Sequence, residues 1–159
     1  MVDRFERFSF AINEITRCWH RLAAEEMGKY GLKGPYSIYF TTMSRFPKGI
    51  TAAKLGELCG RDKADVSRAI ALMESKGLVY KDTSAKNTYR APLKLTDSGM
   101  ELAQHINEKT AYAVELACRG IEWEKGVIFY EILETVTANM QALSKEGLPS
   151  FDTKKNTEA

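Results

Sequence analysis

Residues 62–76 combine an apolar face with a face of small and hydrogen-bonding residues. Val66, Ile70 and Met73 recur at the spacing of the buried side of a helix. The opposite and flanking positions hold Lys63, Ala64, Ser67, Arg68 and Ala71. Small side chains let a helix sit deep in the major groove of DNA, where an arginine can donate two hydrogen bonds to a guanine edge or hold a phosphate. The pattern predicts a helix that contacts duplex DNA; a plain solvated face is the alternative.

Positive charge is concentrated around these residues. The chain of 159 residues has a net charge of +2, but residues 45–94 hold 11 Lys or Arg against 5 Asp or Glu, a net charge of +6. The flanking segments together carry −4. A basic segment in an otherwise neutral or acidic chain is typical of polyanion binding. The rival interpretation is that this segment binds another protein instead of DNA. A protein-binding surface should expose an apolar patch, and Leu72 is the one large apolar candidate on this face.

Capping residues and glycines predict two short helices in this segment. Thr51 can cap the first helix, which Gly60 ends. Asp62 can cap residues 62–76, and Gly77 is placed to end them.

A hairpin is expected directly after these helices. Residues 78–81 and 91–95 are predicted strands, and the polar loop 83–87 lies between them. Two helices followed by a hairpin form a winged helix-turn-helix. A further helix is expected before this motif, at 35–46, where Pro35 suits a first helical position.

Three long helices are expected around this motif, at residues 3–28, 97–119 and 123–144. The first has apolar residues at alternating spacings of three and four, a seam that packs against a partner helix. This apolar surface exceeds what a lone winged domain can bury, so we expect a homodimer; packing within one chain is the alternative for part of it. The predicted dimer interface consists of Phe5, Phe8, Ile12, Ile15, Phe129, Ile132, Val136 and Met140.

Four short runs carry a resemblance to a known family. They are Lys54-Leu55-Gly56-Glu57-Leu58, Asp65-Val66-Ser67-Arg68, Met73-Glu74-Ser75-Lys76-Gly77-Leu78-Val79 and Leu95-Thr96-Asp97-Ser98-Gly99. In this order and spacing the chain resembles the multiple-antibiotic-resistance regulator (MarR) family over about residues 1–145. The resemblance implies a mainly α fold with a small β-hairpin wing, flanked by long dimerisation helices. It also implies a cytoplasmic transcription regulator, usually a repressor, that binds a pseudo-palindromic operator as a homodimer.

The resemblance divides the chain into three regions. Residues 1–34 and 96–147 form the helical dimerisation region, and residues 35–95 form the DNA-binding region, with recognition helix 62–76 and wing 78–95. Residues 148–159 are expected to be a flexible tail.

The wing is expected to contact DNA beside the recognition helix. Lys86, Asn87 and Arg90 are the candidates for the minor groove or the backbone, and Thr51 can offer its backbone N–H to a phosphate or simply cap its helix. Many family members carry an Asp-Arg-Arg run here, but residues 86–91 have one arginine and no acidic residue.

An effector pocket is a further expectation from the resemblance. MarR-like proteins usually bind a small molecule in a crevice between the dimer helices and the winged domain. An arginine beside aromatic rings suits an aromatic or phenolic carboxylate. The residues that could line such a crevice are Trp19, Tyr36, Tyr39, Phe40 and Arg45. Aromatic residues at helical spacing are also typical of a plain core, which is the alternative.

Other chemistry finds little support in the sequence. Cys18, Cys59 and Cys118 are widely spaced and predict reduced, mostly buried thiols. A redox sensor is an alternative, because Arg17 and Arg21 could lower the pKa of Cys18. His20 and His105 lack metal-ligand spacing, and no enzyme motif is present, so we expect no metal, no cofactor and no catalysis. No apolar run approaches the roughly 20 residues of a membrane span.

Overall fold

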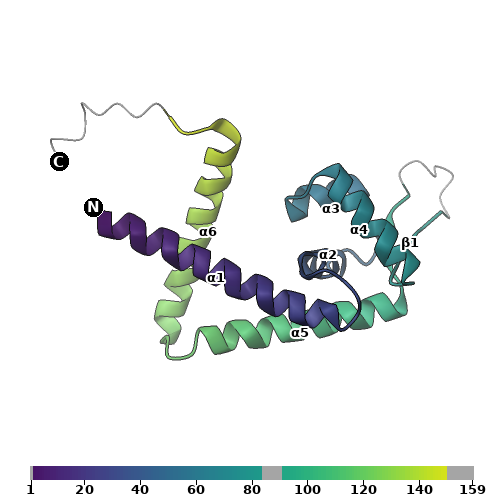
Figure 1. Cartoon of the computed structure of the whole chain (residues 1–159), viewed down its shortest axis with the longest axis horizontal. Coiled ribbons are helices and arrows are strands. Elements are labelled where there is room, and N and C mark those ends of the chain that lie inside the picture. The colour runs from purple at the N-terminus through teal and green to yellow at the C-terminus, as the bar shows by residue number, and fades with distance from the viewer. Residues whose placement is uncertain (1, 84–90, 150–159) are drawn as a thin grey trace. The chain divides into compact units, whose positions relative to one another are not determined.

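The computed structural model of the chain describes residues 2–83 and 91–149 (Figure 1). It separates into two compact units, Met1–Tyr112 and Ala113–Ala159. The boundary falls inside helix α5 (Asp97–Ala117), whereas the sequence analysis placed a boundary at residue 95. The difference arises because the first turns of α5 pack into the same core as the winged segment. The expected three-region division stays a prediction.

The first unit begins with the expected long helix, α1 (Val2–Gly28). The single helix expected at 35–46 is instead a 3-10 turn, η1 (Gly34–Tyr36), followed by α2 (Ser37–Met43). The turn lies so close to α1 that a Cβ on Gly34 would stand 2.8 Å from the backbone nitrogen of Ala24. The N–H groups of Arg45 and Phe46 donate to carbonyls three residues back instead of four, so the α-helical pattern stops before these residues.

The two helices of the helix-turn-helix form as predicted. Helix α3 (Ala52–Cys59) starts where the Thr51 hydroxyl accepts a hydrogen bond from the backbone N–H of Lys54, and it ends at Gly60 in the left-handed conformation. Helix α4 (Lys63–Ser75) starts where a carboxylate oxygen of Asp62 accepts one from the N–H of Asp65, at 2.8 Å. These side chains satisfy helix-end N–H groups that would otherwise lack partners.

The wing contains the two expected strands in a shorter form. Strand β1 (Val79–Lys81) pairs antiparallel with β2 (Leu93–Leu95). The sequence analysis missed Ile50, which makes two backbone hydrogen bonds to Leu93 on the other side of β2. One isolated residue has no alternating pattern, so no sequence signal marked this bridge.

The start of α5 is fastened to the end of α4. The Thr96 hydroxyl donates to the carbonyl of Gly77 at 2.7 Å, and it also accepts a hydrogen bond from the backbone N–H of Gly99. The backbone N–H of Thr96 donates to the carbonyl of Leu78 at 3.1 Å. A Cβ on Gly99 would overlap that same carbonyl oxygen, so the approach requires glycine.

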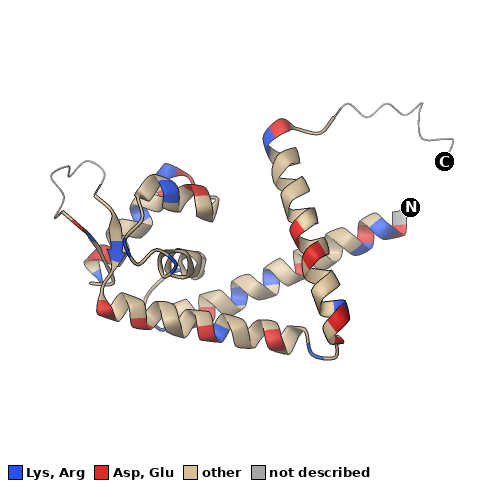
Figure 2. Cartoon of the chain, turned by 180° about the vertical axis from the view of Figure 1, so that it is seen from behind, with Lys and Arg blue, Asp and Glu red and all other residues tan. Residues whose placement is uncertain are grey.

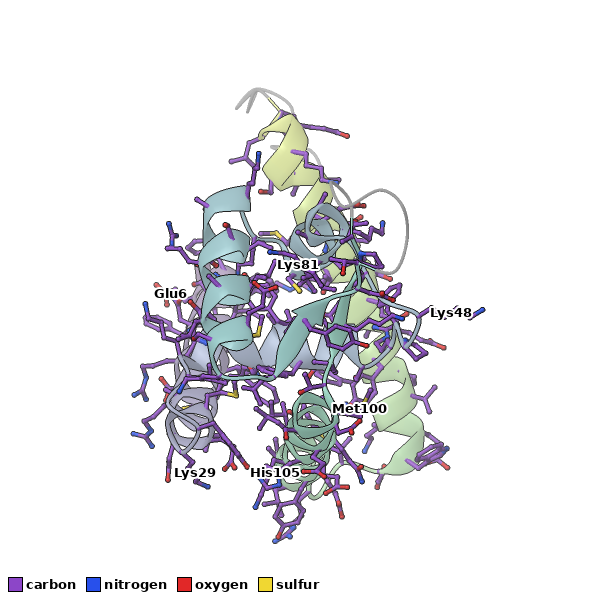
Figure 3. All side chains as sticks on the ribbon, turned by 90° about the vertical axis from the view of Figure 1, so that its right-hand side faces the viewer. Glu6, Lys29, Lys48, Lys81, Met100 and His105 are labelled. Carbon is purple, nitrogen blue, oxygen red and sulfur yellow. The ribbon has the colours of Figure 1, made fainter. Side chains whose placement is uncertain are left out.

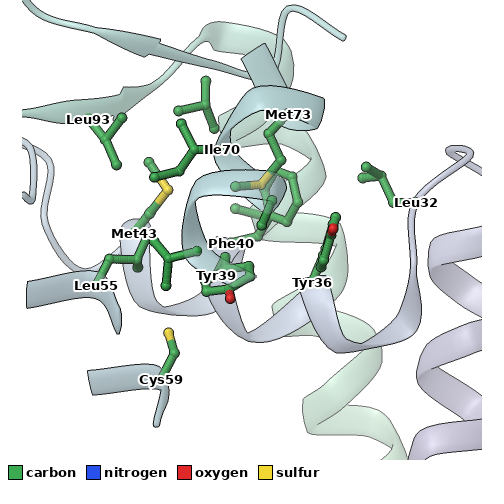
Figure 4. Packing of buried hydrophobic residues seen from close by; sticks show 14 of the residues in the cluster. Leu32, Tyr36, Tyr39, Phe40, Met43, Leu55, Cys59, Ile70, Met73 and Leu93 are labelled. Carbon is green, nitrogen blue, oxygen red and sulfur yellow. The ribbon is translucent and has the colours of Figure 1, made fainter. Parts of the chain in front are cut away.

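One apolar core joins all the helices of the first unit (Figure 4). It includes the predicted buried side of α4 and also Ala69, which is fully buried. Tyr39, Phe40 and Met43 of α2 lie at its centre.

The end of α1 is attached to α5 by the carboxylate of Glu26. This carboxylate lies 2.7 Å from the ring nitrogen of His105 on α5 and also pairs with Lys29. Figure 3 labels His105 and Lys29. Hydrogen bonds from Lys29 and His105 lower the pKa of Glu26.

The second unit contains the end of α5 and helix α6 (Trp123–Glu146). No described residue of α6 is buried. Most of its apolar side chains are exposed in the single chain, with Trp123 82% exposed. None of the helices in the described ranges has the length and apolar character needed to cross a membrane.

Replacing Gly99 by alanine should lower the free energy of unfolding by about 1–3 kcal/mol, because the added methyl group overlaps the Leu78 carbonyl. Urea denaturation followed by circular dichroism measures this change. Gly28→Ala is the matched control: Gly28 ends α1 with nothing within 4 Å of a built Cβ, so we expect a change of no more than about 1 kcal/mol. Equal stability of Gly99→Ala and the wild type would contradict the predicted clash.

Candidate nucleic-acid interface

The exposed face of α4 carries five of the nine residues that the sequence analysis assigned to DNA contact. Lys63, Ala64, Ser67, Arg68 and Ala71 all lie in α4 and all are exposed. Leu72, the apolar candidate of the rival protein-binding interpretation, is half-buried and packs against the core. This face therefore presents small and cationic side chains.

A hollow of about 420 Å³ lies beside this face, between α3, α4 and β1. Small or aliphatic side chains form much of its lining, including Ala52, Ala53 and Gly56. Gly56 lets the two helices approach, because a Cβ there would stand 3.1 Å from both the Arg61 carbonyl and a Val66 methyl group. Its charged lining residues are Arg61, Lys63, Lys81 and Glu74. The balance of charge in the hollow is positive, which suits a phosphate backbone.

Arg68 has a carboxylate beside it. A guanidinium nitrogen of Arg68 lies 3.7 Å from one Asp65 oxygen, and a guanidinium nitrogen of Arg61 lies 4.0 Å from the other. The hydroxyl of Tyr39 donates a hydrogen bond to Asp65 at 3.2 Å. Burial and the neighbouring carboxylate raise the pKa of Tyr39.

The sequence analysis did not assign Arg61 and Asp65 to the site. Their spacings of three and four residues along α4 and its preceding turn are those of side chains that meet on a helix, so a signal was present. The contact with Tyr39, 26 residues away, left no such signal.

The base of the wing is held by two ion pairs. Lys81 lies 3.4 Å from a carboxylate oxygen of Glu74, and Lys94 lies 2.7 Å from Asp82. The hydrogen bond to Asp82 raises the pKa of Lys94. The predicted contact residues Lys86, Asn87 and Arg90 lie outside the described residues.

The side chain of Thr51 caps α3, which is one of the two roles that the sequence analysis gave this residue.

Figure 2 shows that basic residues recur around the helix-turn-helix, whereas acidic residues recur along α5. Helix α1 also carries arginines, so the distinguishing feature of the segment around α4 is its net charge, +6 over residues 45–94.

The five residues expected at an effector pocket lie in different environments. Tyr36, Tyr39 and Phe40 are buried in the core, as the alternative interpretation expected. Arg45 is exposed, and Trp19 is 39% exposed. An effector pocket lined by all five would require the core to open, because side chains packed inside it have no surface for a ligand.

The cysteines are less buried than expected. Only Cys59 is buried, and this desolvation raises the pKa of its thiol, which disfavours the reactive thiolate. Cys18 and Cys118 are partly exposed. Arg17 pairs with Glu14, and the Cys18 thiol lies 3.5 Å from the same carboxylate. Within residues 2–83 and 91–149, no cluster of three or more His, Cys, Asp or Glu could hold a metal ion.

Most of the apolar residues predicted at the dimer interface are exposed within their own units. Phe5, Phe8, Ile12 and Ile15 are exposed along α1. Phe129, Ile132 and Met140 are exposed along α6, and Val136 is partly exposed. Phe10, outside the seam, is also exposed.

Comparison with known proteins gives one family. Residues 30–87 match the model of the MarR family, whereas no curated protein matches the chain significantly. The solved transcriptional regulator SlyA has 21% identity and a TM-score of 0.76, over 84% of this chain and 93% of its own. A putative MarR-family regulator from Listeria monocytogenes, solved with a 26mer DNA, has 23% identity and a TM-score of 0.76, over 89% of this chain and 96% of its own.

A third solved structure agrees with these two. A MarR protein from Peptoclostridium difficile has 20% identity and a TM-score of 0.75, over 85% of this chain and 88% of its own. The first two of these proteins are described as transcriptional regulators, not as enzymes. Residues 30–87 match the MarR-family model, and the chain has the fold of these solved proteins.

Proposed function

We propose that this protein is a homodimeric, sequence-specific DNA-binding transcription regulator that acts in the cytoplasm. The exposed face of α4 carries the proposal, because it combines small residues with Lys63, Ser67 and Arg68 and lies beside a positively charged hollow. A helix with these properties can enter the major groove and donate hydrogen bonds to base edges. The wing residues Lys86, Asn87 and Arg90 would contact the flanking minor groove or backbone.

The relatives support the same function. The Listeria monocytogenes neighbour was solved with DNA, and its fold extends over 89% of this chain. From the likeness to these regulators we also propose that the protein represses transcription. The bound dimer would block access of RNA polymerase to the promoter. A small aromatic effector would release it, although three of the five predicted pocket residues are core residues.

The exposed apolar side chains of α1 and α6 support the proposed dimer. Exposed aromatic and aliphatic residues recur on one side of α1, and others cover α6. Large exposed apolar patches mark interaction sites. A two-fold dimer places two α4 helices about one DNA turn apart, roughly 34 Å, and therefore reads a pseudo-palindrome.

Selection from randomised duplex DNA at near-physiological salt tests this function. Sequencing of the bound fraction should give a two-fold symmetric motif with half-sites about 10 base pairs apart. Binding that is equal for all sequences, or no binding at low salt, would count against a sequence-specific regulator and favour the protein-binding alternative.

Arg68→Ala should weaken binding to the selected duplex by about 1–3 kcal/mol, or roughly 5- to 150-fold, because it removes a base-reading or phosphate-holding cation. Fluorescence anisotropy with labelled duplex measures the loss. Arg119→Ala, which removes the same charge outside the winged helix, should leave affinity almost unchanged. Equal affinities of Arg68→Ala and the wild type would remove Arg68 from the interface.

Ile12→Glu should shift the protein from dimer toward monomer, because it places a carboxylate in the centre of the apolar seam of α1. Sedimentation velocity at several concentrations measures the change. Arg21→Glu puts the same side chain on nearly the opposite side of α1 and should leave the dimer intact. A wild-type chain that sediments as a monomer would refute the predicted interface.

A further inference from the structure

The Asp65 carboxylate occupies an unusual position for a helix that approaches DNA. It belongs to the first turn of α4, three residues before Arg68 and four after Arg61. A negative charge at this place repels phosphate, so the charge alone weakens binding to any duplex. Its neighbours point to another role.

A buried hydroxyl holds this carboxylate in place. The Tyr39 side chain is fully buried in the core, and its hydroxyl donates to one Asp65 oxygen at 3.2 Å. The ring of Tyr39 packs against that of Tyr36, with centroids 5.8 Å apart, which fixes the direction of the hydroxyl. The core therefore determines where the Asp65 oxygens lie, although the Asp65 side chain itself is 28% exposed.

Each Asp65 oxygen lies beside a different arginine. The contacts to Arg68 and Arg61, at 3.7 and 4.0 Å, are longer than direct hydrogen bonds, and the Arg68 side chain is 68% exposed. Ion pairs of this kind contribute little to stability. They restrict the directions that two long side chains can take, which lowers the entropy lost when an arginine binds in one geometry.

We propose that Asp65, anchored by Tyr39, is a positioning residue that holds Arg68 and Arg61 in place for DNA reading, so that both arginines contact DNA. The proposal rests on the proposed function, and it adds Arg61 to the contact residues. The core of the winged domain thereby sets the direction of the guanidinium groups on α4.

Asp65→Asn tests the proposal, because it keeps an oxygen for the Tyr39 hydroxyl and removes the charge. Affinity is measured for the duplex selected by the wild type and for a shuffled duplex of equal length. The ratio of the two affinities should fall by about two- to fivefold, the range that an exposed ion pair can contribute. A purely electrostatic role would raise both affinities alike and leave the ratio unchanged, which would overturn the proposal.

Two further variants separate positioning from folding. Tyr39→Phe keeps the ring in the core and removes only the hydroxyl, so the ratio should fall in the same direction by less. Glu57→Gln removes a carboxylate from α3 that pairs with Lys54 and touches neither arginine, and it should leave the ratio unchanged. An equal fall of the ratio in Glu57→Gln would overturn the proposal. Thermal melts show whether each variant is folded.

A measurement without DNA keeps this inference apart from the proposed function. The heteronuclear NOE of the arginine Nε–H groups reports how ordered the Arg61 and Arg68 side chains are in the free protein. We expect high values in the wild type and in Glu57→Gln, and lower values in Asp65→Asn and Tyr39→Phe. Unchanged values in Asp65→Asn overturn the positioning role. If the wild type selects no duplex, the proposed function fails and the proposal that depends on it is overturned too, whatever the NOE shows.

Discussion

The carbonyl group of Leu78 is the point on which the arrangement of the winged segment depends. It accepts the backbone N–H of Thr96 and lies against Gly99, so the first turn of α5 can sit directly on the end of α4 and the start of β1. The Thr96 hydroxyl fastens the same turn to Gly77. A backbone contact of this kind tolerates no side chain, and α4 gains a fixed position because its end cannot move without separating α5 from the strand.

The exposed face of α4 and its buried face have opposite requirements. The buried face needs volume to fill the core, which Val66, Ile70 and Met73 supply. The exposed face needs little volume, because large side chains would keep the helix away from the floor of a DNA groove. Asp65 lies between the two faces: its carboxylate meets the hydroxyl of buried Tyr39 on one side and exposed Arg68 on the other. Asp65 thus links the packed core to the exposed face of α4.

Helices α1 and α6 each expose apolar side chains within their own units. An amphipathic helix gains most of its stability from burying its apolar face. Here Ile15 and Trp123 are exposed in their respective units. A second copy of the chain is the occupant proposed above, and a two-fold dimer of this kind would read a two-fold symmetric operator.

The sequence by itself determined the local elements, because their signals are local. The caps Thr51, Asp62 and Thr96 and the glycine after α3 mark helix ends through contacts within a few residues, and the spacing along α4 separates its buried face from its exposed one. Contacts between distant residues were decided by tertiary structure alone. Aromatic spacing could not tell a ligand pocket from a core, so Tyr36, Tyr39 and Phe40 remained candidates for both until packing buried them. The Ile50 bridge and the Tyr39–Asp65 hydrogen bond likewise join segments whose separation in sequence carries no periodic signal.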